Sequence, residues 1–127
     1  MKTVIVKGII AAAAALLCAG GLWQTANAAS QQARVRARKA RAREIFDQRC
    51  ARCHGRDGRG ETRLGRMLEV PDFTDGAWWG GVSEERVKES ISKGMGPMPA
   101  FGRKLTRRDI SSLAAYVRGF GKVDSSQ

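Results

Sequence analysis

Three side chains that commonly bind metals or cofactors stand within five consecutive positions, Cys50-Ala51-Arg52-Cys53-His54. The segment uses two of the three cysteines in the chain and its only histidine. Two thiols at this spacing on a helical turn reach both vinyl groups of one porphyrin, and a histidine directly after the second thiol is then held under the iron. The segment therefore predicts one covalently attached c-type haem, with thioethers at Cys50 and Cys53 and with His54 as the proximal iron ligand.

Three other interpretations of this segment fit less well. A dithiol redox pair belongs in a strand-helix-strand context, and nothing before Cys50 resembles a buried strand. A structural zinc site needs four Cys or His ligands, but only three are adjacent, and Cys18 lies in a segment that we expect to be removed. A plain disulfide would leave His54 without a role.

Residues 1–28 have the pattern of an export signal peptide. Two lysines precede an apolar run over residues 8–22, and Ala26-Asn27-Ala28 offers a small-x-small cleavage site. The run is short for a membrane span, which needs about 20 apolar residues, so we favour cleavage over a retained anchor. Cys18 is interpreted as an ordinary residue of the signal. Because thioether attachment of haem belongs to the oxidising side of bacterial membranes, we expect a periplasmic protein.

The rest of the chain is long enough for one domain and too short for two. Residues 29–43 form a basic arm, rich in alanine and without any acid, that is helical or disordered. Its basic residues are Arg34, Arg36, Arg38, Lys39, Arg41 and Arg43. Residues 44–122 form the predicted haem domain, and residues 123–127 a flexible tail. Such a small domain buries a modest core, to which a porphyrin would add apolar surface.

The predicted domain is all-α, with four or so short helices around the haem. An amphipathic helix from Glu44 carries both cysteines and ends at Gly55. A short helix with Leu64, Met67 and Leu68 on one side follows, stopped by Pro71. The two tryptophans, Trp78 and Trp79, are expected in a loop over residues 72–81.

Two further helices have recognisable capping residues. The first is expected from Glu84 to Gly94, with Ser83 as its N-cap. The last is expected from Thr106, which forms a capping-box-like pair with Asp109, to Gly119.

A stiff loop between these two helices supplies the candidate for the distal iron ligand. Met98 lies between two prolines within the segment 94–102, which excludes regular helix or strand. A thioether on such a loop suits the sixth iron position and would raise the reduction potential, although methionine also fills cores. Met95 and Met67 are the competing candidates.

Residues 42–121 resemble the small monohaem bacterial cytochromes c of the His/Met-ligated class. The resemblance rests on five segments: Cys-x-x-Cys-His at 50–54, Gly-Arg-Asp-Gly-Arg-Gly at 55–60, Val-Pro-Asp-Phe at 70–73, Met-Pro-Ala-Phe at 98–101 and Leu-Ala-Ala-Tyr-Val-Arg at 113–118. It implies thioethers at the two cysteines, a proximal histidine and a distal methionine at Met98.

The resemblance also implies a close crossing of the first and last helices, with Phe46 meeting Leu113 and Tyr116. Relatives often have a proline whose carbonyl accepts the Nδ1–H of the proximal histidine, and Arg63 stands about where that proline is expected. The two tryptophans either donate to a haem propionate or simply cover the porphyrin.

An iron bound from both sides leaves no open position for a substrate, so we expect one-electron transfer and not an enzyme. If Met98 is not a ligand, the iron is five-coordinate and the protein binds gases or acts as a weak peroxidase. A further alternative is that the chain is the haem subunit of a larger respiratory or dehydrogenase complex.

The net charge of +11 favours acidic redox partners, such as an oxidase, a reductase or a dehydrogenase. The basic arm also suits contact with an anionic membrane surface. A nucleic-acid partner is not expected outside the cytoplasm.

Overall fold

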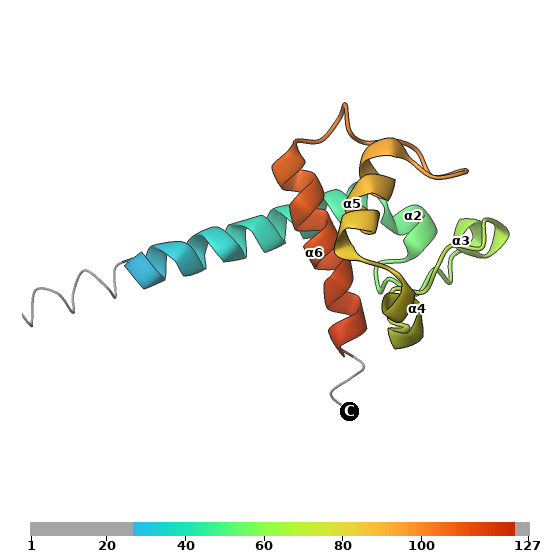
Figure 1. Ribbon diagram of the computed structural model, residues 1–127, viewed down its shortest axis with the longest axis horizontal. Helices are drawn as coiled ribbons and strands as arrows, with labels where there is room; N and C mark the ends of the chain where they lie inside the picture. The colour runs from blue at the N-terminus through green and yellow to red at the C-terminus, as the bar shows by residue number, and fades with distance from the viewer. Residues whose placement is uncertain (1–26, 124–127) are drawn as a thin grey trace, which may run out of the picture. The chain divides into compact units, whose positions relative to one another are not determined.

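The computed structural model describes residues 27–123, and this part of the chain is helical (Figure 1). A first helix is described over residues 27–49, and α2 (Ala51–His54) follows it after a turn at Cys50. The later helices are α3 (Arg63–Met67), α4 (Gly76–Gly81), α5 (Glu84–Lys93) and α6 (Arg107–Val123). The described residues contain no strand, and their only β-type pairing is an isolated bridge between Met95 and Met98. The all-α prediction is confirmed.

The predicted signal peptide lies almost wholly outside the described residues, as do residues 124–127 of the predicted tail. Within residues 27–123, no helix combines the length and the apolar character that a membrane span requires.

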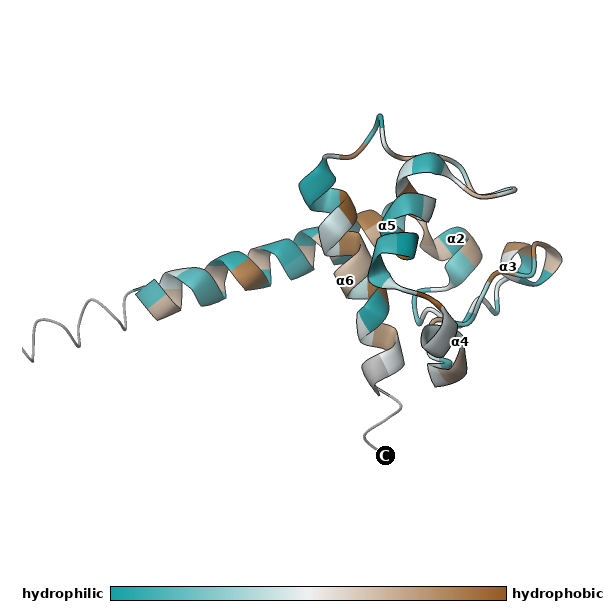
Figure 2. Cartoon of the chain, in the orientation of Figure 1, coloured by the Kyte–Doolittle hydropathy of each residue, from teal (hydrophilic) through white to brown (hydrophobic). Residues whose placement is uncertain are grey.

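The first helix includes the whole predicted basic arm, residues 29–43. The chain divides into two compact units between Ala37 and Arg38. Residues 27–37 are all exposed, and Figure 2 shows these turns as mainly hydrophilic. In the second unit, Ala42 is completely buried, so the packed domain begins before the expected start at residue 44.

The core of the second unit forms where the helix containing Phe46 packs against α6. The Phe46 ring is 1% exposed and lies 5.5 Å from the Tyr116 ring and 5.4 Å from the Phe120 ring, measured between centroids. Leu113 is equally buried in the same cluster. The expected crossing of the first and last helices is therefore confirmed. Helix α5 lies beside α6 and adds Val87 and Ile91 to this core.

Side-chain caps fix the starts of the later helices. The Ser83 hydroxyl accepts a hydrogen bond from the Arg86 amide at the start of α5. At the start of α6, Thr106 Oγ1 accepts from the Asp109 amide, and the Asp109 carboxylate accepts in return from the Thr106 amide and hydroxyl. Both predicted caps are confirmed, and each satisfies amides that the helix itself leaves unpaired.

Several predicted boundaries are wrong. The helix expected from Glu44 to Gly55 belongs to a helix that starts before Glu44, and a turn at Cys50 separates it from α2. Residues 76–81 form α4, not a loop, because the Asp75 carboxylate caps the helix by accepting from the Ala77 amide. The last helix continues past Gly119 to Val123. The packing of Phe120 against the Phe46 and Tyr116 rings holds this extra turn in place.

Candidate functional site

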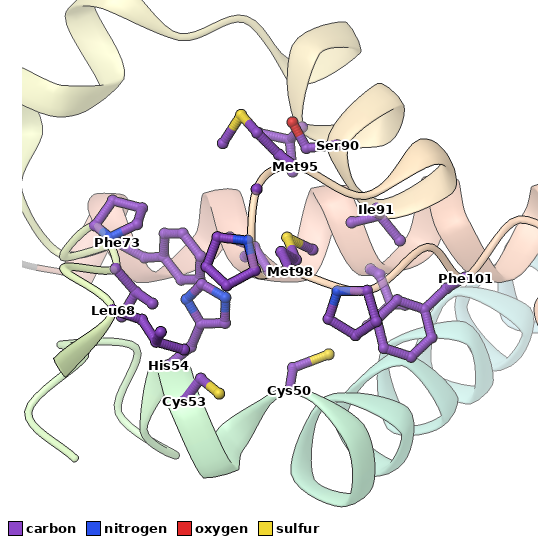
Figure 3. Close-up of a pocket in the computed structure, with 18 of the residues that line it drawn as sticks. Cys50, Cys53, His54, Leu68, Phe73, Ser90, Ile91, Met95, Met98 and Phe101 are labelled. Carbon is purple, nitrogen blue, oxygen red and sulfur yellow. The ribbon is translucent and has the colours of Figure 1, made fainter. Parts of the chain in front are cut away.

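One apolar cavity of about 750 Å³ brings together the residues that the sequence singled out. The cavity is lined by Cys50, Cys53, His54 and Met98 (Figure 3). Phe73 and apolar side chains of α5 and α6 complete the lining. Cofactor sites are typically concave, of about 300–1,000 Å³, and mostly apolar with a few polar groups. The cavity therefore has the size and character of a site for a large, mostly apolar cofactor.

Helix α2 and its N-cap, Cys50, place both thiols and the imidazole within one turn. The amides of Cys53 and His54 both donate to the Cys50 carbonyl, at 3.1 and 3.0 Å. Gly55 then ends the helix with φ +74°, where a Cβ would also meet the Asp57 carboxylate. The three side chains therefore enter the same cavity from one short element.

Cys50 and Cys53 form no disulfide in the described part of the chain. Burial raises the pKa of the Cys50 thiol to about 11, although Arg49 opposes this shift. A redox-active dithiol pair depends on a thiol with a lowered pKa, so this environment does not suit one. Nor do residues 27–123 contain a cluster of three or more His, Cys, Asp or Glu side chains arranged to hold a metal ion, as a zinc site would require.

His54 is held by stacking rather than by hydrogen bonds. Its ring lies 4.6 Å from the Phe73 ring at an interplanar angle of 18°. Burial lowers the pKa of His54, which favours the neutral imidazole that binds metals. Its Nδ1 is buried and finds no hydrogen-bond partner in the described part of the chain. Buried polar atoms are nearly always paired, so the unpaired Nδ1 is an exception. His54 also lines the apolar cavity, and the residues there fit a haem.

No hydrogen bond joins this nitrogen to the carbonyl of Arg63, which stands about where relatives often have a proline. Arg63 is the first residue of α3, and a carbonyl in the first turn of a helix points along the helix axis into its own hydrogen-bond ladder.

The turn after His54 is fastened by Thr62 and Gly65. The Thr62 hydroxyl donates to the Cys53 carbonyl at 2.9 Å and accepts from the Gly65 amide at 2.8 Å. Gly65 packs directly against the backbone carbonyls of Cys53 and Gly60, so closely that no Cβ fits there. The sequence interpretation missed both residues, although a Thr-x-x-Gly pair just after the cysteines was available as a signal.

The loop of Met98 is fixed at both ends. Met95 and Met98 exchange two backbone hydrogen bonds, of 3.1 and 3.0 Å. Farther along, the amides of Phe101 and Gly102 donate to carbonyls of α5, at 2.9 and 3.0 Å. These hydrogen bonds hold the loop of Met98 in place, in agreement with the stiff loop that the prolines predict.

The three candidate methionines differ in position. Met98 is partly buried and packs against the core, and Figure 3 shows its side chain within the group of cavity residues. Met95 also lines the cavity but is 53% exposed, and its sulfur lies 3.7 Å from an Arg86 nitrogen. Met67 is 67% exposed and is not among the lining residues.

The two tryptophans have different roles. Trp79 is buried and donates its indole N–H to the Phe73 carbonyl at 2.8 Å, so this group is not available to a propionate. The Arg118 guanidinium lies 4.5 Å from the Trp79 ring centroid, in a cation–π contact. Trp78 lines the cavity and lies 5.4 Å from the Phe73 ring. Phe73 thus links His54 to both indoles, a role that the sequence interpretation did not assign.

Comparison with known proteins gives a consistent result. The family model described as cytochrome C oxidase, cbb3-type, subunit III matches residues 37–117. A cbb3-type cytochrome c oxidase subunit CcoP from Cereibacter sphaeroides is 40% identical over 78 residues, which cover 61% of this chain and 26% of the relative. The chain thus spans about a quarter of the length of such relatives. Cytochrome c6 from Microcystis aeruginosa is 37% identical over 73 residues, which cover 58% of this chain and 85% of the relative.

Solved structures agree with these sequence relatives. The KustC0563 c-type cytochrome is 38% identical, with a TM-score of 0.58, and the match covers 62% of this chain and 95% of that one. The matched part of this chain therefore corresponds to nearly the whole length of a small cytochrome.

Proposed function

Because this chain belongs to the family of cytochrome c oxidase, cbb3-type, subunit III, as a c-type cytochrome domain with covalently bound haem c, we propose that it is an exported one-electron carrier. Cys50 and Cys53 form the two thioether bonds to the haem. His54 and Met98 bind its iron from the two sides. The bound haem supplies a centre that gains and loses one electron.

One observation carries this proposal: a single apolar cavity collects two thiols, an imidazole and a thioether from separate elements. Helix α2 and its N-cap, Cys50, contribute the thiols and the imidazole, and the loop between α5 and α6 contributes Met98. The apolar lining excludes water, and the stacking of His54 on Phe73 orients the imidazole. The anchored loop holds Met98 in one place, where its sulfur would serve as the second iron ligand.

A matched pair of methionine variants tests the assignment of the distal ligand. Met98→Ala is expected to open the sixth iron position, so that the reduced protein binds carbon monoxide and its absorption spectrum shifts. Met95→Ala removes an equal side chain from the same loop and is expected to leave the spectrum unchanged. If carbon monoxide binds the Met95→Ala protein and not the Met98→Ala protein, the assignment is reversed. If it binds the unmodified protein equally well, the iron is five-coordinate and the carrier proposal fails.

The CcoP and FixP relatives favour a second candidate, a haem subunit of a larger complex. Those proteins are named as subunits of an oxidase, and this chain corresponds to about a quarter of their length. The match over 85% of a cytochrome c6 favours the free carrier. The mass of the native protein in solution separates the two, because a carrier migrates as a single small chain and a subunit co-purifies with larger partners.

The charge of the chain suits an acidic redox partner such as an oxidase. Opposite charges on the two proteins would speed their encounter, and added salt would weaken this effect. Deleting the whole arm would not test this, because Ala42 is completely buried and Arg41 pairs with Asp109 at 3.7 Å. Substituting Arg34 and Arg36 with glutamine removes two exposed charges instead. This variant is expected to slow electron transfer at low salt and to match the unmodified protein at high salt. Equal rates at low salt would refute a docking role.

A further inference from the structure

A second concave site lies apart from the haem cavity and is strongly basic. It is a cleft of about 290 Å³ between the first helix and the start of α6. The residues that line it are Arg38, Arg107, Arg108, Ser111 and Ser112. None of them lines the haem cavity. We call this site the arginine cleft.

The arginine cleft concentrates positive charge that the protein does not neutralise. Within residues 27–123, its three guanidinium groups form no ion pair, and its two serine hydroxyls form no hydrogen bond. The nearby acid, Asp109, is already engaged by Thr106 and Arg41. Arg41 and Arg43, on the same helix as Arg38, do have acidic partners. The three arginines of the cleft therefore leave their donors to a common hollow.

We propose that the arginine cleft binds a phosphate group. A guanidinium presents a planar fork of N–H donors that matches two oxygens of an oxyanion. Three guanidinium groups and two hydroxyls offer many hydrogen-bond donors. One carboxylate has only two oxygens and one charge, so it cannot accept from all of them. A phosphate carries three or four acceptor oxygens and up to two negative charges, so it satisfies the donors of both helices at once. The group belongs either to free phosphate or to a lipid headgroup, and both present the same chemistry.

The test measures binding of inorganic phosphate, at constant ionic strength set by chloride, to the haem-loaded full chain by titration calorimetry. A second arm measures sedimentation with vesicles of phosphatidylglycerol in phosphatidylcholine. Arg107→Gln/Arg108→Gln is expected to weaken binding at least tenfold, since each charged hydrogen-bond donor typically contributes a factor of about ten or more. The control Arg34→Gln/Arg36→Gln removes the same charge outside the cleft and is expected to change affinity less than threefold.

A third variant separates a built site from general charge. Ser111→Ala/Ser112→Ala leaves the net charge unchanged and is expected to weaken phosphate binding about threefold or more. Circular dichroism and haem absorbance confirm that each variant is folded.

Saturable binding of inorganic phosphate with this pattern supports the proposal with free phosphate as the ligand. The same pattern with vesicles alone supports a lipid phosphate. The proposal is overturned if both arginine pairs weaken binding equally or if neither probe binds.

Discussion

Replacing Gly65 with alanine is expected to destabilise the protein, although alanine is the better helix former. Gly65 lies in the middle of α3 and is buried against the backbone carbonyls of Cys53 and Gly60. A Cβ at this position meets backbone atoms rather than the flexible end of a side chain, so either the turn after His54 or α3 has to move. The substitution therefore tests whether this contact positions the haem-binding turn.

The expected size follows from two opposing contributions. Overpacking typically costs 1–3 kcal/mol, and a backbone clash belongs at the upper end, about 3 kcal/mol. The helix preference of alanine over glycine offsets about 1 kcal/mol. The net loss is about 2 kcal/mol, which for a domain of this size lowers the midpoint of thermal unfolding by about 8–16 °C.

Gly119→Ala is the matched control. Gly119 lies inside α6, and a Cβ there would meet nothing within 4 Å. This variant is expected to be as stable as the unmodified protein or more stable by about 0.5–1 kcal/mol. Thermal unfolding followed by circular dichroism measures both proteins in the haem-loaded state. If Gly65→Ala unfolds at or above the temperature of the unmodified protein, the argument from close packing is wrong.

Three further substitutions test other contacts. Trp79→Phe keeps a ring but leaves the buried Phe73 carbonyl without its hydrogen-bond donor. Chemical denaturation should therefore show a decrease of about 1–3 kcal/mol in the free energy of unfolding. An equal decrease in Trp78→Phe would contradict this explanation. Phe46→Ala should cost about 3–5 kcal/mol because its ring is 1% exposed, and a loss below 1 kcal/mol would contradict the helix crossing. The hydrogen bond from the Thr106 hydroxyl lowers the pKa of Asp109. The ionised Asp109 therefore stabilises the fold fully above the ordinary carboxyl pKa, and this stabilisation is lost as the pH falls through the lowered pKa. Asp109→Asn should therefore cost about 1 kcal/mol at pH 7 and progressively less in acid, and a pH-independent loss would refute the assignment.

The sequence predicted best where a local pattern decides the structure. The spacing of Cys50, Cys53 and His54 is a property of one helical turn, so their common position at the cavity followed from the sequence. The caps at Ser83 and Thr106 are equally local, because each joins a side chain to an amide three residues later.

The sequence predicted less where contacts distant along the chain decide the structure. Residues 76–81 are an exception, because the glycines around Trp78 and Trp79 suggested a loop although the bonds that hold a helix there are local: Trp79 to the Phe73 carbonyl and the Asp75 cap. Gly119 suggested an end to α6, but the packing of Phe120 on Phe46 extends it. The stacking of Phe73 on His54 joins residues of two segments, which periodicity alone does not bring together.

The absorption spectrum of the purified, reduced protein, recorded before and after addition of carbon monoxide, tests the central claim most directly. If His54 and Met98 hold a covalently bound haem from both sides, the spectrum has the sharp visible bands of a low-spin c-type haem, and carbon monoxide leaves it unchanged. A spectrum that shifts with carbon monoxide, or a protein without haem absorbance, would contradict the account.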